Sequence, residues 1–356
     1  MATICLNMIV RDEAAVIERC LASVRPFIDY WVIVDTGSID DTPARIAAAL
    51  SGVPGELHHC AWRDFGYNRT DALQRARSKA DYLLFIDADE QLAGAGVSAR
   101  PPLTAPAYSL EARYGDLRYD RVSLVSTRLP WRWKGVLHEY LDAGQTVEQP
   151  RLPGLWIAVT PDGARSSDPA KFAKDAAVLL AALEAEPDNA RYVFYLAQSY
   201  RDAGKPELAR QYYRRRAGMG GWEEEAWYSL YQVAWLGQCL GEPRSVVLDG
   251  YLHAYDVRPE RAEPLVALAA YLRGRREWNL AYLFAGTAAR IPPSGDRLFV
   301  DVTAYRWRAL DELALAAFYT GRQGEAGRLW RDILATPGLP ANDRSRIETN
   351  LTFVTT

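Results

Sequence analysis

Three carboxylates directly follow an apolar run in the sequence YLLFIDADEQL, residues 82–92. Asp87 and Asp89 are two positions apart, so an extended chain places their side chains on the same side, and Glu90 crowds a third carboxylate beside them. Paired carboxylate oxygens suit Mg²⁺ or Mn²⁺, and these ions commonly stay bound to the phosphates of a substrate. The spacing predicts a divalent-cation site where a buried strand ends, with a solvated acidic turn as the alternative.

A second chemically suggestive segment is WRWKGVLHEYLD, in which His138 and Glu139 are adjacent. It is not the H-E-x-x-H motif of zinc proteases, because Asp142 stands where the second histidine would be. In a loop, two neighbouring side chains can flank one pocket. We therefore expect His138 to complete the metal shell begun by Asp89, and Glu139 to accept a proton from an attacking nucleophile. A structural role for the pair is the alternative.

The sequence VDTGS resembles the catalytic turn of aspartic proteases, but a protease of this kind needs two such turns and the chain has one. As the end of a strand that leads into a helix, the segment suits a nucleotide better. Asp35 can accept a hydrogen bond from a base N–H, and nearby backbone N–H groups can face a ligand. Asn68 and Arg69 stand where another helix is expected to begin, and Arg69 could neutralise a phosphate or bind a base carbonyl. Plain helix capping and a surface ion pair are the alternatives.

The first half of the chain alternates short apolar runs with helical patterns. This alternation predicts a parallel sheet covered by helices, in which ligands bind beyond the carboxyl ends of the strands. Asp35 and Asp87 both stand at such ends. The expected strands are 4–10, 31–35, 57–62, 82–87 and 155–160, and the expected helices are 12–24, 38–50 and 70–80.

The second half of the chain shows no convincing strand after about residue 170, and it follows the tetratricopeptide pattern. Small residues stand where two helices would touch, glycine stands at the turn, and matching positions recur at later repeats. We expect an all-α solenoid, whose concave face commonly binds peptides or a second subunit, so a homodimer through this half is one expectation. The residues that carry the pattern are Leu196, Ala197, Tyr200, Gly204, Ala209 and Tyr213, and again Leu313, Ala314, Gly321, Ala326 and Trp330.

Composition narrows the functional classes. A formal net charge of −3 gives no global attraction to nucleic acid or to an anionic membrane. No uncharged apolar run approaches the length of a membrane span, and the N-terminus lacks the pattern of a signal peptide. The four cysteines have neither metal-ligand nor disulfide spacing, which indicates reduced thiols and a cytoplasmic protein.

Taken together and in order, NMIVRDEAAVIERCLASV, VDTGSIDDT, FGYNRTDAL, LLFIDADEQL and GVLHE resemble family-2 glycosyltransferases of the GT-A fold. The resemblance covers roughly residues 3–160. It implies a Rossmann-like α/β nucleotide-diphospho-sugar transferase domain over 1–165, followed by the tetratricopeptide-like solenoid over 166–356. Peptide S-glycosyltransferases of bacteriocin pathways have a related layout.

The resemblance also implies roles for individual residues. Asp35 would contact the nucleobase, Asp87 the ribose or the metal, and Asp89 the metal on the diphosphate, with Glu139 or, three residues on, Asp142 as catalytic base. The implied reaction is an inverting sugar transfer, of the hexosyltransferase type, from a nucleotide sugar that is expected to be a uridine compound, with Mn²⁺ or Mg²⁺ as cofactor. The expected substrate-binding residues are Arg11, Glu13, Asp35, Thr36, Gly37, Asn68, Arg69, Asp87, Ala88, Trp131 and Trp133, and the expected metal ligands are Asp87, Asp89 and His138.

Competing functions differ in class. A nucleotidyltransferase would normally carry a glycine-rich loop after the first strand, and LNMIVRDEAA has no glycine. A catalytically inactive interaction protein is disfavoured by the intact carboxylates. The helical half favours a protein or peptide acceptor. Basic and aromatic residues interleaved over 113–134 leave a modified nucleotide or DNA base as the alternative acceptor.

Overall fold

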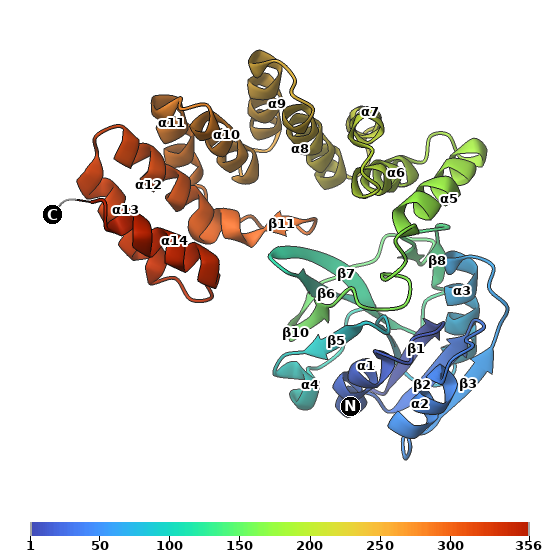
Figure 1. Cartoon of the computed structure of the whole chain (residues 1–356). Helices are drawn as coiled ribbons and strands as arrows, with labels where there is room; N and C mark the ends of the chain where they lie inside the picture. The colour runs from blue at the N-terminus through green and yellow to red at the C-terminus, as the bar shows by residue number, and fades with distance from the viewer. Residues whose placement is uncertain (1, 355–356) are drawn as a thin grey trace. The chain divides into compact units, whose positions relative to one another are not determined.

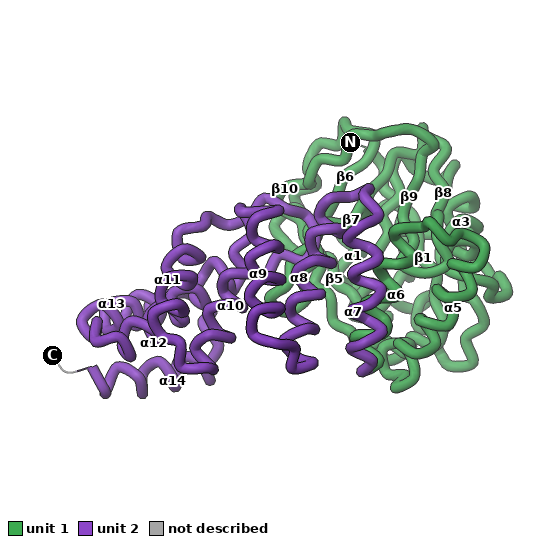
Figure 2. The backbone as a smooth tube through the Cα atoms, turned by 90° about the horizontal axis from the view of Figure 1, so that it is seen from above, with its two compact units in different colours: residues 1–203 green, residues 204–356 purple. Residues whose placement is uncertain are grey.

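The structure, a computed structural model, describes residues 2–354. The chain forms two compact units, Met1–Ala203 and Gly204–Thr356 (Figure 2). The first unit holds the sheet together with the first two helices of the helical half. The domain boundary expected from the sequence, at 165/166, lies where the chain changes from strands to helices, whereas the two compact units divide at 203/204. The expected domain boundary stays a prediction.

The first strands form a parallel half-sheet. Its strands are β1 (Ile4–Val10), β2 (Tyr30–Asp35), β3 (Gly55–His59) and β4 (Tyr82–Phe85), side by side in the order β3-β2-β1-β4. Four of the apolar runs recognised in the sequence are these strands, although β3 was expected two residues later. The side chains of β1, β2 and β4 are mostly buried, as in parallel sheets that are covered on both faces, whereas β3 at the edge is only partly buried.

Beyond β4 the sheet is mixed, with antiparallel pairs β4–β7, β7–β6 and β10–β5 and one parallel pair β6–β10, which the sequence analysis did not predict. The order continues β4-β7-β6-β10-β5, where β5 is Glu90–Ala93, β6 Ala107–Tyr114, β7 Leu117–Ser126 and β10 Arg151–Val159. β6 and β7 are a hairpin that turns at Gly115, whose φ of 55° favours glycine. The expectation of a parallel sheet was therefore wrong for this half, and the domain has the curled mixed sheet of the GT-A class.

Helices cover both faces of the sheet (Figure 1). Alternate residues of β1 point to opposite faces: Leu6 packs with α1 (Ile17–Val24) and α2 (Thr42–Ala49), and Cys5 packs with α3 (Phe65–Ala76). A short helix α4 (Gly96–Ala99) and a small second sheet of β8 (Arg132–Lys134) and β9 (Tyr140–Asp142) complete the domain, with a 3₁₀ turn at Arg25–Phe27.

Two helices begin elsewhere than expected, and side-chain hydrogen bonds explain both shifts. The first starts at Ile17 instead of residue 12, because Asp12 N donates to Ser38 Oγ at 2.9 Å and so joins the turn after β2. The third starts five residues early, because the Asp64 carboxylate caps it by accepting from Tyr67 N at 2.8 Å.

Residues 171–354 are helical apart from connecting loops and the two-residue strand β11 (Val300–Asp301), and within each unit consecutive helices pack against each other as the repeat pattern predicts. Ala314 and Ala326 are fully buried where α12 meets α13, and Gly321 makes the turn between them with a φ of 81°. No helix within residues 2–354 is long and apolar enough to cross a membrane. The helices are α5 (Lys171–Ala185), α6 (Ala190–Asp202), α7 (Pro206–Ala217), α8 (Glu223–Cys239), α9 (Arg244–Val257), α10 (Glu263–Gly274), α11 (Trp278–Ala288), a π-helical turn Ala304–Arg308, α12 (Ala309–Tyr319), α13 (Gln323–Leu334) and α14 (Ala341–Leu351).

Candidate active site

The acidic segment forms a tight turn between β4 and β5. Asp87 N donates to Glu90 Oε2 at 3.0 Å, and Glu90 N donates to the Asp87 carbonyl oxygen at 3.1 Å. Glu90 therefore closes the turn and is buried, with 3% of its surface exposed. Asp87 and Asp89 stand just beyond the carboxyl end of β4, where ligands of such sheets bind.

Two arginines hold the first carboxylate of this turn. Arg69 Nη2 lies 2.5 Å from Asp87 Oδ1, and Arg121 Nη1 lies 3.4 Å from Asp87 Oδ2. Burial opposes ionisation of Asp87, but the two guanidinium groups outweigh it and lower the pKa of Asp87 to about 2. Arg121 also donates to Glu90, at 3.0 Å from Oε1. The turn is thus anchored from α3 and from β7.

Arg121 was not recognised from the sequence as a partner of Asp87. Leu84 of β4 is paired with Leu124 of the antiparallel strand β7. Continuing that register by three residues brings Asp87 opposite Arg121. The pairing joins segments about forty residues apart, and only the position of the hairpin beside β4 reveals it.

Arg69 also binds the candidate base. Its Nε forms an ion pair with Glu139, and both side chains are nearly buried, at 12% and 10% exposed. The guanidinium lies 5.2 Å from the ring centre of Trp133, which itself packs edge-on against Phe85 of β4. Arg69 therefore joins the acidic turn to the His138–Glu139 loop and brings these two sequence motifs together. The contact does not test the expected roles of Asp87 as a donor ligand or of Glu139 as a base.

His138 faces away from the acidic turn toward α6. Its ring stacks on Tyr195 with centroids 3.8 Å apart and planes 7° apart, and its carbonyl oxygen accepts from Arg191 Nε at 2.9 Å. Within the described residues, no three His, Cys, Asp or Glu side chains are grouped as a metal site. A cation at Asp87 and Asp89 would therefore need further oxygens from a bound ligand, as Mg²⁺ and Mn²⁺ commonly do.

Asp142, the alternative base, belongs to the small β8–β9 hairpin. Its carboxylate lies 2.7 Å from Lys134 Nζ and 3.5 Å from Arg132 Nε. The hydrogen bond from Lys134, with further donation from the Gly144 backbone, lowers the pKa of Asp142. Its partners lie in and beside its own hairpin and do not include Arg69.

Asp89 is covered by the segment that follows β10. A Cβ on Gly163 would lie 3.1 Å from Asp89 Oδ2 and 3.0 Å from Glu13 Oε2, so only glycine fits between the two carboxylates without displacing them. Ala164 N donates to Glu13 Oε2 at 3.2 Å. Burial, with the nearby charges of Asp89 and Asp87, raises the pKa of Glu13 to about 7. Burial and Asp87 likewise raise the pKa of Asp89. Negative charge is thus under-compensated here, and the carboxylates fit an added cation.

The same covering segment is fastened to α1. Arg19 makes two hydrogen bonds to Asp162, at 2.8 Å and 2.6 Å, and its Nη2 reaches the Asp89 carbonyl oxygen at 3.4 Å. Neither Arg19 nor Gly163 was singled out from the sequence, because they are more than 140 positions apart and only the fold brings them together.

The end of β2 carries a second buried carboxylate. Asp35 is 2% exposed and accepts from Ser38 Oγ at 2.6 Å, from Ser38 N at 3.1 Å and from His59 Nδ1 at 3.1 Å. Thr36 is also buried and donates to the Val10 carbonyl oxygen at 3.1 Å. Gly37 turns the chain with a φ of 111°. Asp35 is therefore at the expected edge of the sheet but is already fully partnered.

Several other expected binding residues serve the fold. Asn68 is fully buried and brackets the start of α3, accepting from Arg63 N at 2.9 Å and donating to the Ala61 carbonyl oxygen at 3.0 Å. Trp131 is 3% exposed, which differs from the expected open stacking face, because its indole N–H donates into the core to the Ser126 carbonyl oxygen at 3.0 Å.

Two further expected residues flank the site. Ala88 is buried in the acidic turn, at 6% exposed. Arg11 directly follows β1, is exposed, and its Nε lies 3.7 Å from Asp12 Oδ2.

Comparison with known proteins matches residues 5–96, which include the ends of β1, β2, β3 and β4, to the family described as glycosyl transferase family 2. The N-terminal part of the chain is a family-2 glycosyltransferase domain. The predicted resemblance and fold class are thereby confirmed for this domain. The matched segment contains the acidic turn and Arg69, but it ends before Arg121 and Glu139.

Two proteins of known sequence are similar to this chain over part of their length. The chain is 36% identical over 170 residues to the TPR repeat-containing protein Synpcc7942_0270 of Synechococcus elongatus, covering 45% of this chain and 41% of the relative. It is 34% identical over 88 residues to the SPbeta prophage-derived glycosyltransferase SunS of Bacillus subtilis, covering 24% of this chain and 20% of the relative. The chain therefore spans less than half the length of these relatives.

Similarity to solved structures is partial and low in sequence identity. One such structure is the crystal structure of MamA, with 15% identity and a TM-score of 0.39, covering 51% of this chain and 92% of that one. Another is the C-terminal part of a TPR repeat-containing protein from Cytophaga hutchinsonii, with 17% identity and a TM-score of 0.40, covering 49% and 65%.

The basic stretch of the family-2 domain over 113–134 is largely engaged within the domain. The guanidinium of Arg113 lies 4.1 Å from the Trp156 ring centre and its Nε 2.7 Å from Glu111. Arg118 donates to the carbonyl oxygens of Gly115 and Leu117, at 2.6 Å and 2.8 Å. Together with the pairing of Arg121, these contacts engage much of the positive charge that could otherwise contact a nucleic-acid backbone.

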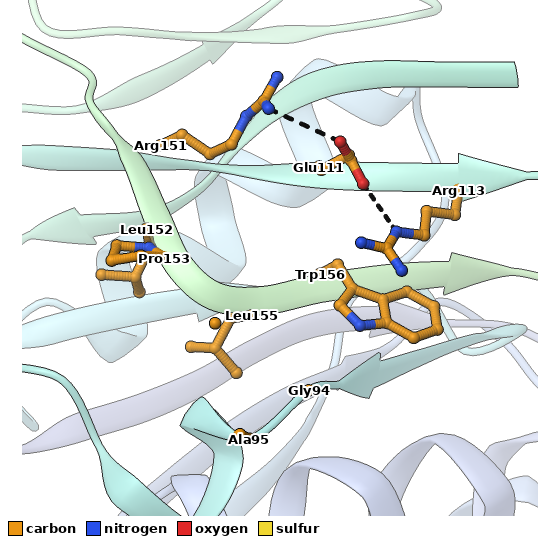
Figure 3. A pocket seen from close by; sticks show the side chains of 10 residues that line it. Gly94, Ala95, Glu111, Arg113, Arg151, Leu152, Pro153, Leu155 and Trp156 are labelled. Atoms are coloured by element: carbon orange, nitrogen blue, oxygen red, sulfur yellow. Dashed lines mark hydrogen bonds and ion pairs between the residues drawn. The ribbon is translucent and has the colours of Figure 1, made fainter. Parts of the chain in front are cut away.

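A shallow cavity of about 380 Å³ lies where β10 bulges between its neighbours β6 and β5 (Figure 3). Glu111 lies between Arg113 and Arg151 at its rim, and Arg151 also lies 2.8 Å from Asp120, so two carboxylates compensate two arginines. Its lining contains none of the site residues expected from the sequence. The lining residues are Gly94, Ala95, Glu111, Arg113, Arg151, Leu152, Pro153, Gly154, Leu155 and Trp156.

Proposed function

We propose that this chain is a glycosyltransferase that transfers a sugar, with inversion, from a nucleotide sugar to a protein or peptide acceptor. The observation that carries the proposal is the position of Arg69, which contacts Asp87 of the acidic turn and Glu139 of the distant loop at once. A donor-binding carboxylate and a candidate base are thereby held within one side chain of each other, as a displacement at a sugar carbon requires.

Asp89 and Asp87 would hold Mn²⁺ or Mg²⁺ together with the donor diphosphate, and Glu13 would add a third oxygen ligand or bind beside them. When bound, the cation stabilises the negative charge that builds on the departing nucleoside diphosphate. Arg69 and Arg121 supply fixed positive charge on the other side of Asp87. His138 stays a candidate ligand only if its ring leaves Tyr195.

Glu139 is the better-supported base. Its position on Arg69 brings it next to the donor residues, whereas Asp142 is bound by Lys134 of its own hairpin. Glu139 would take the proton of the acceptor group as that group attacks the sugar.

A protein or peptide acceptor is favoured over nucleic acid. Most basic side chains of residues 113–134 have partners inside the domain, namely Arg113, Arg118, Arg121, Arg132 and Lys134. The second compact unit is built of stacked helix pairs that carry exposed aromatic side chains, including Trp222, Trp235 and Tyr319. Such faces commonly bind peptides or a second subunit. A homodimer and a cytoplasmic location belong to the same proposal.

The test of the function is release of nucleoside diphosphate from a donor. The full chain is incubated with uridine and guanosine diphosphate sugars in Mn²⁺, and free nucleoside diphosphate is measured over time. Slow hydrolysis of one donor, absent from the Asp87→Ala variant, is the expected result. Failure to bind or hydrolyse any donor, with the protein folded, would favour the inactive interaction protein. Mass spectrometry of host proteins and nucleic acid with and without the gene then identifies the acceptor.

A substitution at Gly163 tests the covering segment. Gly163→Ala is expected to leave the fold intact but to weaken Mn²⁺-dependent binding of uridine diphosphate by roughly twofold to tenfold, because the added methyl group displaces the Asp89 and Glu13 carboxylates. Titration calorimetry measures the affinity. The control is Gly324→Ala in α13, where an added Cβ meets nothing within 4 Å. Equal affinity in both variants and the wild type would show that the segment moves away when the ligand binds.

A further inference from the structure

The last residues of β2 and β3 form a pair at the carboxyl edge of the sheet. Asp35 and His59 are register partners on these parallel strands, and His59 Nδ1 lies 3.1 Å from Asp35 Oδ2. Their exposure differs sharply: the Asp35 side chain is 2% exposed, and the imidazole is 73% exposed. A ligand that approaches this edge therefore meets the imidazole before the carboxylate.

The buried carboxylate has no acceptor position turned outward. Asp35 Oδ1 accepts from Ser38 Oγ at 2.6 Å and from Ser38 N at 3.1 Å, and Oδ2 faces the imidazole. Ser38 Oγ is fixed in turn, because it accepts from Asp12 N at 2.9 Å. These contacts fix Asp35 within the loops and make it a support for the imidazole.

The carboxylate also sets the tautomer of His59. A carboxylate only accepts hydrogen bonds, so the imidazole must present Nδ1–H to Asp35. In the neutral ring the other nitrogen, Nε2, is then an acceptor. Nε2 has no hydrogen-bond partner among residues 2–354. The pair thus presents a single oriented acceptor on the ligand-facing edge.

We propose that His59 reads the nucleobase of the donor by accepting a hydrogen bond from its ring N–H, and that Asp35 acts as the positioning residue. Uracil carries such an N–H at N3 and guanine at N1, whereas cytosine and adenine present an unprotonated ring nitrogen there, which would face Nε2 as a second acceptor. The inference rests on the proposed use of a nucleotide-sugar donor, and it selects donors with uracil, thymine or guanine.

The distance between the two parts of the site agrees with such a ligand. β3 and β4 are three strand spacings apart in the order β3-β2-β1-β4, which is about 14 Å at the usual spacing of neighbouring strands. A nucleoside diphosphate lying across the strand ends would place its phosphates at Asp87 and Asp89 and its base at His59. The turn at Gly37 leaves room beside this path, because a Cβ there would meet nothing within 4 Å.

Titration calorimetry of the full chain in Mn²⁺ tests the proposal with uridine diphosphate, its N3-methyl derivative and cytidine diphosphate. We expect the wild type to bind uridine diphosphate roughly threefold to tenfold more tightly than either analogue, the contribution of one hydrogen bond. His59→Ala should lose that preference for uridine diphosphate over cytidine diphosphate, and His59→Gln, whose amide oxygen also accepts, should restore part of it.

The matched control is His58→Ala. His58 is the preceding residue, points to the opposite face of β3, and its Nε2 lies 2.9 Å from Glu56. This variant should keep the wild-type preference. Asp35→Asn gives a further signature: an amide N–H facing Nδ1 turns Nε2 into a donor, so the preference should move toward cytidine diphosphate. If His59→Ala keeps full preference for uridine diphosphate, the inference is wrong although the function stands; if the wild type binds no nucleoside diphosphate, the proposed function itself fails.

Discussion

Replacement of Glu139 by glutamine is expected to lower sugar transfer on the order of 100-fold or more, with donor and metal affinity near the wild type. Glutamine keeps the shape and the hydrogen bonding of the side chain but removes the proton acceptor, and a positioned base typically contributes a factor of about 10²–10⁴. Transfer rates at saturating donor measure the effect. Until the acceptor is known, donor hydrolysis, in which water attacks, is the readout and should show a smaller loss of the same sign.

The control for this variant is Asp142→Asn. Asp142 is the competing base, but its contacts lie in the β8–β9 hairpin, so its replacement should slow transfer little. The reverse pattern, in which Asp142→Asn stops transfer and Glu139→Gln does not, assigns the base to Asp142. If neither variant slows transfer, the His138–Glu139 loop has a structural role only.

Removal of the cation is the second change with a large expected effect. Donor hydrolysis should stop in excess chelator and return with Mn²⁺ or Mg²⁺, and Asp89→Ala should abolish metal-dependent donor binding while the protein stays folded. The reason is electrostatic: without a cation the donor diphosphate would face the carboxylates of Asp89, Asp87 and Glu13, and burial together with the Asp87 charge already raises the pKa of Asp89 and of Glu13. Calorimetry with and without Mn²⁺ measures the binding.

A surface carboxylate, Asp168, provides the control variant for Asp89→Ala. Asp168 is bound to Lys174 at 2.6 Å on the surface, and Asp168→Ala should leave metal-dependent binding unchanged. Full turnover in excess chelator would remove the cation from the mechanism and would leave Arg69 and Arg121 as the charges that stabilise the leaving group.

Three strands of the parallel half of the sheet, β1, β2 and β4, could be predicted because each is a largely apolar run, whereas β3 has the weaker sequence GELHH. The β6–β7 hairpin could not, since residues 117–122 of β7 are half-exposed and polar, so they carry no strand-like run. The candidate site was likewise predicted only in part. Asp87, Asp89 and Arg69 stand next to recognisable strand and helix ends, and the sequence places them. Arg121 and Gly163 reach the site through strand pairing and a long return of the chain, and no local pattern in the sequence marks them.

His58 and His59 show a second reason why the site could not be fully predicted from the sequence. His58 and His59 are adjacent and chemically identical, and the sequence gives no reason to choose between them. The side-chain alternation of β3 decides: one ring meets Glu56, and the other meets Asp35 at the strand end. Which of two neighbouring residues belongs to a site is set by one position of register, which depends on the whole sheet.

The double attachment of Arg69 has a kinetic consequence. With the donor site empty, the guanidinium is shared between Asp87 and Glu139, so Glu139 is held by a fixed cation. A diphosphate that arrives beside Arg69 competes with Glu139 for the same N–H groups and carries more negative charge. Loading of the donor then frees the base, and the acceptor finds a competent enzyme only afterwards. The order of addition would be compulsory, donor first and acceptor second, and it would be imposed by one side chain.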